Sequence, residues 1–344
     1  MPIIGVIIAT SQLALSLLAG LPSSENLERF EFRQPQMGTE FFLVLYTADE
    51  ETARRASDAA FARIAKLNEA FSDYDPESEL MRLCEKAGGP PVKVSPDLFR
   101  ILTLAQHWSE TSGGAFDITM GPVGRLWRRA RRTREMPEAE TLQRARALVG
   151  YKNVRLDPEA GTVELLIPGI KLDLGGIAKG FAADEALKVL KGLGVGQALV
   201  AAAGDIATGE PPPGKPGWDV EVQALKSAKD EKGPSPTVQL SGRNISTSGD
   251  AEQFVEIDGV RYSHILDPRT GLGVIGRSSA TVIANDGTTA ECLAKIISIL
   301  GPEQAMPIVD ATPGAAAFYV RVADDGVIQP FTSGRWAEVV KTTP

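Results

Sequence analysis

Hydrophobic positions recur along this chain at two spacings, and each spacing predicts a different kind of element. Between residues 50 and 70 they recur at helical spacing, which predicts a long helix with a narrow apolar stripe. Residues 30–46 predict two strands around the segment Gln36 to Thr39, the second of them dense in β-forming side chains. Further helices are expected at residues 79–84, 95–111, 181–191 and 288–301. Further strands are expected at residues 154–157, 162–167, 198–204, 238–247, 254–257, 261–266, 279–284, 315–322 and 327–329.

The order of these elements indicates the fold class. Helices and strands are mixed without a strict β–α–β alternation, so we expect an α/β fold of the mixed α+β kind. With 344 residues, 43% of them hydrophobic and 23% charged, the chain has the composition of a globular protein with a sizeable core. The sequence shows no internal repeat.

Residues 3–21 form an apolar run without a charged side chain. The run resembles a secretory signal peptide with a cleavage region near Ala19 and Gly20, although no Lys or Arg precedes Arg29. An uncleaved membrane anchor and a buried N-terminal helix are the alternatives. We expect residues 1–24 to be a signal peptide or anchor. The protein would then be periplasmic or attached to the outer face of the cytoplasmic membrane.

A glycine-rich segment, Asp173-Leu-Gly-Gly-Ile-Ala-Lys-Gly-Phe-Ala-Ala-Asp184, lies between a strand end predicted at residues 170–173 and a predicted helix. At such a junction Gly175 and Gly176 let backbone N–H groups approach an anion, which the positive helix end favours. Lys179 adds a cation in the first helical turn. The segment predicts a cradle for a phosphate or pyrophosphate. The alternative is an ordinary strand–helix connection, because short glycine motifs often occur by chance.

The charged, cysteine and histidine residues exclude several classes of partner and site. A net charge of -8 argues against a nucleic-acid-binding protein. Residues 125–134 hold six arginines, but three glutamates follow at once, so a solvated helix face or loop is expected there. Cys84 and Cys292 lack the spacing of a disulfide framework or zinc site and are expected to be free buried thiols. His107 and His264 are too few for a multi-histidine metal centre.

Five glycine-rich or polar clusters are spread over the chain, and their order is more specific than any one of them. They are Met37-Gly-Thr39, Ser112-Gly-Gly-Ala-Phe-Asp-Ile-Thr119, Asp173 to Asp184, Gly204-Asp205, and Thr247-Ser-Gly-Asp250 with Ser263-His-Ile-Leu-Asp-Pro-Arg-Thr-Gly271. With these clusters the chain resembles the ApbE family of FAD:protein FMN transferases from about Gln36 to Gly301. The most diagnostic phrases are S-H-I-L-D-P-R-T-G beside T-S-G-D, and D-L-G-G-I-A-K-G.

The resemblance implies a two-lobed fold in which FAD lies in a cleft between the lobes. The family domain would span residues 30–340. The isoalloxazine ring would lie near Met37 and Tyr74, and the glycine-rich turn would lie beside the diphosphate. The residues that the resemblance places at FAD are Met37, Tyr74, Ala115, Phe116, Asp117, Gly175, Lys179, Phe181, His264 and Ile265.

The activity that the resemblance implies is cleavage of FAD and attachment of FMN through a phosphoester to Thr or Ser of a partner flavoprotein, with release of AMP. Such partners carry a Ser/Thr-Gly-Ala-Ser/Thr signature, which the segment Thr111-Ser-Gly-Gly of this chain does not match. Two alternatives share the fold: a catalytically impaired protein that binds or delivers flavin, and an FAD pyrophosphatase that forms FMN and AMP. The family's usual place outside the cytoplasmic membrane agrees with the apolar N-terminal run.

Attack on a pyrophosphate requires positive charge and an activated hydroxyl group. Lys179 and the helix N-terminus would supply the positive potential. His264 is the candidate general base in these clusters, and a histidine packed at a strand end is the alternative. Asp250 and Asp267 would orient His264 or the acceptor hydroxyl. Arg269 would either contact phosphate or brace the turn that follows Asp267.

One family motif is altered in this chain. The family reads roughly A-D-A-L-A-T-A, where the aspartate and the threonine four residues later bind magnesium, together with a backbone carbonyl matching that of Ala178. This chain has Glu291 and Lys295 at the two side-chain positions. Glutamate can ligate a metal, whereas protonated lysine cannot, and at this spacing the two side chains can pair on a helix. We expect either that Lys295 replaces the metal, or that magnesium binding and transfer are lost while flavin binding remains.

Overall fold

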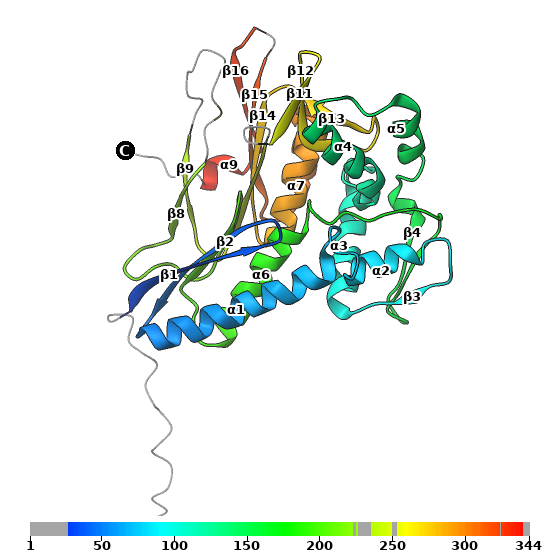
Figure 1. Ribbon diagram of the computed structural model, residues 1–344. Helices are drawn as coiled ribbons and strands as arrows, with labels where there is room; N and C mark the ends of the chain where they lie inside the picture. Colours follow the sequence, from blue (N-terminus) through cyan, green and yellow to red (C-terminus); the bar gives the residue numbers. More distant parts are fainter. Residues whose placement is uncertain (1–26, 223–224, 226–234, 250–252, 324, 340–344) are drawn as a thin grey trace, which may run out of the picture.

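The computed structural model describes residues 27–222, 225, 235–249, 253–323 and 325–339 of the chain (Figure 1). Its centre is an antiparallel eight-stranded sheet. In spatial order the strands are β1 (Glu28–Gln36), β2 (Thr39–Thr47), β6 (Ala198–Ala202), β7 (Asp205–Thr208), β10 (Asn244–Gly249), β14 (Ser278–Ala284), β15 (Ala316–Val322) and β16 (Ile328–Thr332). The expected signal peptide or anchor lies outside the described residues. Within them, no helix is both long enough and apolar enough to cross a bilayer.

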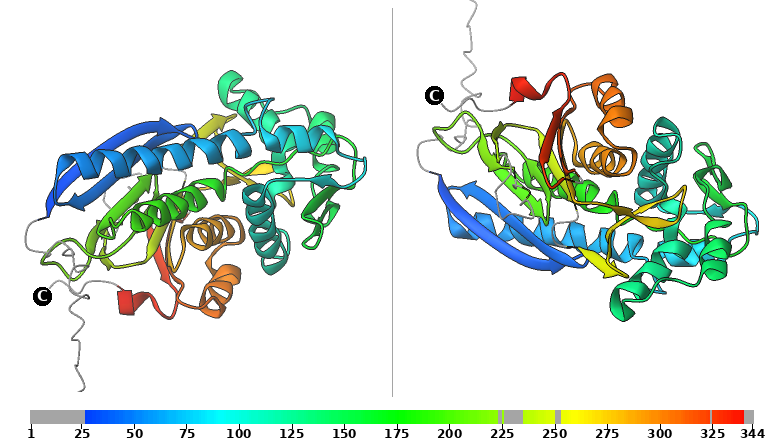
Figure 2. Two further views of the ribbon diagram at one scale, coloured as in Figure 1. Left: turned by 90° about the horizontal axis from the view of Figure 1, so that it is seen from below. Right: turned by 90° about the horizontal axis from the view of Figure 1, so that it is seen from above.

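Helices cover one face of this sheet. They are α1 (Glu50–Phe71), α6 (Ala178–Gly192), α7 (Gly287–Leu300) and α8 (Pro302–Ala311). Figure 2 shows α1, α6 and α7 on the same side of the strands. Leu43 of β2 is fully buried in one cluster with Ile64 and Leu293, because alternate side chains of each strand point to the helices. The helices α6 and α7 approach closely at two glycines, since a Cβ on Gly180 would lie 2.3 Å from the carbonyl oxygen of Gly287.

The opposite face of the sheet is covered by β8 (Trp218–Glu221), β9 (Thr237–Leu240) and α9 (Trp336–Val339). Val282 belongs to the helix-side cluster, whereas the next residue, Ile283, belongs to the cluster on this face. Trp336 stacks on Phe318 of β15, with 5.3 Å between the ring centroids. Burial on both faces explains why β14 is an almost continuous apolar run.

A second lobe lies beside the helix layer, at the right of Figure 1. Its helices are α2 (Glu79–Glu85), α3 (Pro96–Thr111), α4 (Gly121–Thr133) and α5 (Ala139–Arg146). One of its small sheets consists of β3 (Val92–Lys93), β5 (Thr162–Leu165) and β4 (Val154–Asp157) in that order. The other consists of β11 (Phe254–Ile257), β12 (Val260–Asp267) and β13 (Leu272–Ile275). Trp127, Ala145 and Val255 join α4 and α5 to this second sheet.

The mixed α/β class and most of the expected helices and strands are confirmed, but two expectations are wrong. Residues 238–247 do not form one strand, because the chain turns at Gly242, with φ of 60°, and β9 and β10 belong to different sheets. Residues 170–173 are not a strand end. The Asp173 N–H donates instead to the carbonyl oxygen of Ile118 at 2.7 Å, and α6 begins at Ala178 rather than at residue 181. Both cysteines are free and buried, as expected.

Candidate functional site

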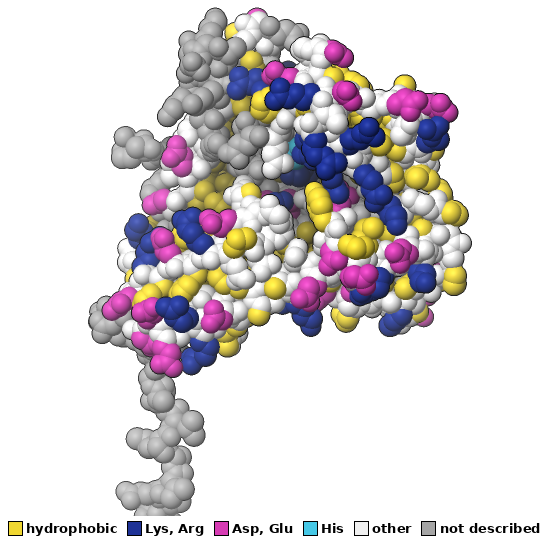
Figure 3. Space-filling model, viewed as in Figure 1, with side chains coloured by type: hydrophobic (Ala, Val, Ile, Leu, Met, Phe, Trp, Pro, Cys, Tyr) yellow, Lys and Arg dark blue, Asp and Glu magenta, His cyan; other side chains and the backbone are white. Residues whose placement is uncertain are grey.

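A cavity of about 770 Å³ lies between the helix layer and the second lobe. This volume is in the range of small-molecule binding sites. Figure 3 shows a hollow in this region with Lys and Arg side chains along its edge. All five clusters singled out in the sequence contribute lining residues, although they are far apart along the chain. Folding therefore converts five separate short motifs into one surface.

The glycine-rich turn forms one wall of this cavity. Oδ1 of Asp173 accepts a hydrogen bond from the Gly175 N–H at 2.8 Å and holds the turn in shape. The absence of a side chain at Gly176 leaves room for two neighbours, since a Cβ there would lie 3.3 Å from Phe116 and 3.7 Å from Lys295. The helix α6 then begins without a side-chain N-cap, and Ala178 in its first turn lines the cavity. These features are compatible with a bound anion.

Lys179, in the first turn of α6, is the centre of a buried ion cluster. Its Nζ forms an ion pair with Glu291 of α7 and lies 3.2 Å from Oδ2 of Asp205. The second carboxylate oxygen of Glu291 accepts the Gly180 N–H at 2.9 Å. Burial lowers the pKa of Lys179, but the carboxylates of Asp205 and Glu291 outweigh it and hold the pKa above its ordinary value. Lys179 is therefore a cation at the edge of the cavity.

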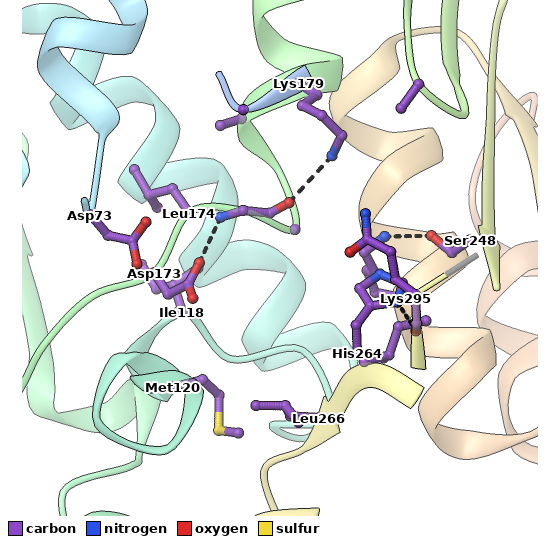
Figure 4. Close-up of a pocket in the computed structure, with 18 of the residues that line it drawn as sticks. Asp73, Ile118, Met120, Asp173, Leu174, Lys179, Ser248, His264, Leu266 and Lys295 are labelled. Carbon is purple, nitrogen blue, oxygen red and sulfur yellow. Dashed lines mark hydrogen bonds between the residues drawn. The ribbon is translucent and has the colours of Figure 1, made fainter. Parts of the chain in front are cut away.

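Lys295 lies one helical turn after Glu291, but within the described part of the chain the two side chains form no ion pair. The Nζ of Lys295 donates to Oγ of Ser248 on β10 at 2.5 Å. Burial, followed by the nearby Lys179 ammonium, lowers the pKa of Lys295. Figure 4 shows Lys295 beside His264 and across the cavity from Asp173.

His264, on β12, has an ordered imidazole ring. Its Nδ1 lies 3.1 Å from the carbonyl oxygen of Gln253. Since a carbonyl only accepts, Nδ1 carries the hydrogen and Nε2 keeps its lone pair. Burial, followed by the positive charge of Lys295, lowers the pKa of His264 to about 4. The ring is therefore neutral at pH 7 and has one nitrogen available to accept a proton.

Across the cavity from Lys295, where Figure 4 shows Asp73 and Asp173, Arg128 of α4 joins these two acidic residues. It forms an ion pair with Asp73, and its Nη2 lies 3.0 Å from Oδ2 of Asp173. Its guanidinium carbon lies 4.2 Å from the centroid of the Tyr74 ring, within cation–π range. Burial and then the Asp173 carboxylate raise the pKa of Asp73. The Arg128 guanidinium thus links the turn that contains Asp73 and Tyr74 to the glycine-rich segment that begins at Asp173.

Asp117 shapes the loop that lines the cavity between these two sides. Its Oδ1 accepts the Thr119 N–H and its Oδ2 accepts the Tyr151 N–H, each at 2.8 Å. Burial raises the pKa of Asp117. The neighbouring residues Ala115 and Phe116 are buried and line the cavity. Asp117 therefore acts on the cavity by positioning this loop.

Most predicted site residues lie at this cavity. They are Met37, Tyr74, Ala115, Phe116, Asp117, Gly175, Ala178, Lys179, His264, Ile265 and Lys295. Phe181 is not among the residues that line this cavity: it is 2% exposed and packs edge-on against Phe71, with 5.6 Å between the ring centroids. Asp250 lies outside the described residues. Arg269 pairs with Asp267 at 2.8 Å and braces the turn, which was one of its two expected roles.

The arginine-rich stretch was only partly predicted. Several of its side chains are exposed, as expected, but Arg128 and Arg131 line the cavity together with Gly124. These three residues are spaced by four and three positions, so they share one face of α4. That spacing was visible in the sequence. The acidic partners of Arg128 were not, because they come from distant segments.

The residues at this site do not fit the magnesium ion that the family resemblance implies. Both carboxylate oxygens of Glu291 are already engaged, one by Lys179 and one by the Gly180 N–H. Lys295 presents an ammonium group, which has no lone pair for a metal. In the part of the chain that the structure describes, no group of three or more His, Cys, Asp and Glu residues could hold a metal ion. Fixed ammonium groups stand where a magnesium ion would need oxygen donors.

Comparison with known proteins gives a consistent result. The model of the ApbE family matches residues 37–319. An FAD:protein FMN transferase from Klebsiella pneumoniae is 32% identical over 270 residues, which are 78% of this chain and 81% of that protein. Another FAD:protein FMN transferase, from Vibrio cholerae, is 30% identical over 321 residues, which are 91% of this chain and 93% of that protein.

Solved structures are similar over the same extent. The flavin transferase ApbE from Vibrio cholerae superposes with a TM-score of 0.81 at 26% identity, covering 91% of this chain and 99% of that one. The ApbE protein from Thermotoga maritima superposes with a TM-score of 0.79 at 29% identity, covering 91% of this chain and 100% of that one. The similarity therefore includes both lobes and the cavity between them.

Proposed function

This chain belongs to the ApbE family, and from that membership we infer that it is an FAD:protein FMN transferase whose cavity binds FAD. The observation that carries this inference is a set of basic side chains around a ligand-sized cavity in a chain of net charge -8. Lys179 and Lys295 lie beside the glycine-rich turn, Arg128 contacts Asp173 in the same segment, and Arg131 also lines the cavity. The diphosphate is the part of FAD that such groups would neutralise.

We propose that the diphosphate lies beside Gly175 and the first turn of α6. The isoalloxazine ring would then lie near Met37 and Tyr74, which also line the cavity. Tyr74 is 75% exposed, and one face of its ring is already covered by Arg128. Its other face offers an aromatic surface for a flat ring. Ammonium groups beside the glycine-rich turn and an aromatic side chain in the same cavity match the phosphate and the isoalloxazine ring of the flavin portion of FAD.

The proposed reaction is displacement at phosphorus. A Thr or Ser hydroxyl oxygen of the acceptor flavoprotein attacks the phosphorus atom that carries the riboflavin group, and a new P–O bond forms. The bond from this phosphorus to the bridging oxygen breaks, and AMP leaves with that oxygen. The hydroxyl proton passes to Nε2 of His264, which is neutral and faces the cavity. Lys179 stabilises the negative charge that develops on the phosphoryl oxygens.

The test uses the full-length protein, FAD and a synthetic peptide that carries a Ser/Thr-Gly-Ala-Ser/Thr segment. We expect the peptide to gain the mass of FMN less one water, with one AMP released for each peptide modified. AMP release without peptide modification would instead indicate hydrolysis of FAD. Absence of both AMP release and FAD binding would contradict the proposed function.

We further propose that the protein acts outside the cytoplasmic membrane on an exported flavoprotein. The uncharged apolar run at residues 3–21 supports this location. Fusion of residues 1–30 to a reporter enzyme that is active only after export provides the test. A fusion that stays inactive in the cytoplasm would contradict export, and a fusion that remains with the membrane fraction would indicate an anchor rather than a cleaved signal.

A further inference from the structure

We propose that Lys295 is a built-in cation that binds the FAD diphosphate, so that this protein binds FAD and transfers FMN without a divalent metal ion. This proposal rests on the proposed function and specifies how that site is charged. It begins from the mismatch between the side chains of the site and the donor set that magnesium requires.

Glu291 is the residue best suited by its chemistry to hold a metal here. Lys179 and the Gly180 N–H occupy its two oxygens, and its side chain is fully buried. Glu291 does not line the cavity, whereas Lys179 does. A metal ion would therefore have to break an ion pair and a hydrogen bond that join α6 to α7. The Glu291 carboxylate thus pairs with Lys179, and Lys179 is the residue that lines the cavity.

The Lys295 side chain is directed toward a neighbouring strand rather than along its own helix. An ion pair with Glu291 at i,i+4 would hold Lys295 along its own helix. Its Nζ instead donates to Oγ of Ser248 on the neighbouring strand β10. A neutral hydroxyl cancels none of the positive charge, and it engages one of the three N–H groups of the ammonium. The remaining N–H groups are available to an anionic ligand.

The Lys295 side chain packs against the glycine-rich turn. Its alkyl stem lies over Gly176, where a Cβ would be 3.7 Å from Cγ and 3.9 Å from Cε of Lys295. The glycine-rich turn thus forms the surface along which the lysine extends toward the cavity. Lys295, Lys179 and Ser248 all line the cavity, and Figure 4 shows them around it. The same turn that is shaped for a phosphate also positions the ammonium that would bind it.

Glu291 and Asp205 neutralise Lys179, so Lys295 is the ammonium group at this wall whose charge is left to attract a diphosphate and to disfavour an added divalent cation. One ammonium carries half the charge of a magnesium ion and provides no octahedral template. The site would therefore polarise the diphosphate less strongly than a metal ion does, but its cation is part of the chain and does not have to be bound from solution. We expect binding and transfer that are independent of magnesium concentration.

The test measures FAD affinity of the full-length protein by quenching of flavin fluorescence, in EDTA and in millimolar magnesium. For the wild type we expect dissociation constants that agree within about twofold in the two buffers. For Lys295→Thr in EDTA we expect affinity weaker by about tenfold or more, the usual scale for loss of a hydrogen bond to a charged group. Magnesium should restore part of this loss, because threonine supplies an oxygen donor. Lys191→Thr, at an exposed lysine on α6, is the matched control and should behave as the wild type.

Two further readouts separate a specific effect from misfolding. Riboflavin, which has no phosphate, should bind wild type and Lys295→Thr equally if only the diphosphate contact is lost. Electron paramagnetic resonance of added Mn²⁺ should show a bound ion in Lys295→Thr but not in the wild type. FAD binding or AMP release by the wild type that requires magnesium would overturn the proposal while leaving the transferase assignment intact. Absence of FAD binding in every condition would overturn both.

Discussion

Lys179 and Glu291, 112 residues apart in the sequence, form an ion pair that joins the first turn of α6 to α7. The same carboxylate accepts the Gly180 N–H. The fully buried Glu291 side chain therefore binds both the Lys179 ammonium and the backbone of the first turn of α6. This arrangement makes Glu291 a structural support of the cavity wall. The contribution of Glu291 to the free energy of unfolding can therefore be measured without a bound ligand.

The first prediction concerns the Glu291→Gln variant. Glutamine keeps the volume and can accept the Gly180 N–H, but it cannot neutralise Lys179. We expect the free energy of unfolding, measured by urea denaturation, to fall by about 2–4 kcal/mol, since the buried ammonium of Lys179 loses one of its two carboxylates and keeps only Asp205. Glu140→Gln is the control, because Glu140 lies in an exposed pair with Arg144. There we expect a change within about 0.5 kcal/mol, and equal losses for the two variants would contradict a special role for Glu291.

The second prediction concerns the contact between α6 and α7. A Cβ at Gly180 would lie 2.3 Å from the carbonyl oxygen of Gly287, and backbone atoms cannot move aside as a flexible side chain would. We expect Gly180→Ala to lower the free energy of unfolding by about 1–3 kcal/mol or more, through overpacking. Gly192→Ala is the control in the same helix, since a Cβ there meets nothing within 4 Å.

For Gly192→Ala we expect no loss, and a gain of up to about 1 kcal/mol from the higher helix propensity of alanine. Thermal and urea denaturation of Gly180→Ala and Gly192→Ala measure these two changes in the free energy of unfolding. If both glycines tolerated alanine equally, the close approach of the two helices would not be a requirement of the fold.

The third prediction concerns Arg128, which bridges Asp73 and Asp173 and covers the Tyr74 ring. Lysine keeps the charge but lacks the planar fork that contacts two carboxylates and an aromatic face together. We expect Arg128→Lys to weaken FAD affinity by about tenfold, the equivalent of 1.4 kcal/mol, because Tyr74 loses its support. The exposed neighbour Arg129 provides the control as Arg129→Lys, which should bind FAD as the wild type does. A wild-type affinity in Arg128→Lys would show that the bridge does not shape the binding site.

Much of this fold could be predicted from the sequence, because its long elements carry strong local patterns. The helices α1 and α7 have apolar stripes at helical spacing, and β14 and β15 are dense in apolar residues. The prediction failed where a single residue decides between neighbouring structures. Gly242 separates β9 from β10 and sends them to different sheets, and no periodicity reveals such a turn.

The site was predicted in outline for a different reason. Its lining residues lie in short motifs of glycine and polar side chains, which are recognisable one by one. Phe181 follows Lys179 by two positions, which is about 200° around a helix, so Lys179 faces the cavity and Phe181 faces the core. The long-range partners of Lys179 and Arg128 had no local signal. They depend on how α6, α7 and the second lobe pack together.

The last prediction concerns the protonation of His264. Burial and the Lys295 ammonium lower its pKa to about 4, so the ring should be neutral throughout the range from pH 5 to 8. A general base acts in its unprotonated form, and acidification should therefore remove activity with a midpoint near pH 4 rather than near the ordinary histidine value. Removing the nearby positive charge in Lys295→Met should move this midpoint upward.

Histidine NMR offers a measurement that does not depend on turnover. The chain has two histidines, so His107→Gln leaves the ring of His264 as a single titrating signal. We expect its midpoint near pH 4 in the free protein and a higher midpoint when Lys295→Met is added. A midpoint near 6.5 would show that the ring is solvated and that Lys295 does not act on it. A matching loss of about 10²–10⁴-fold in transfer rate for His264→Gln would then identify the same ring as the base, because that is the usual contribution of general base catalysis.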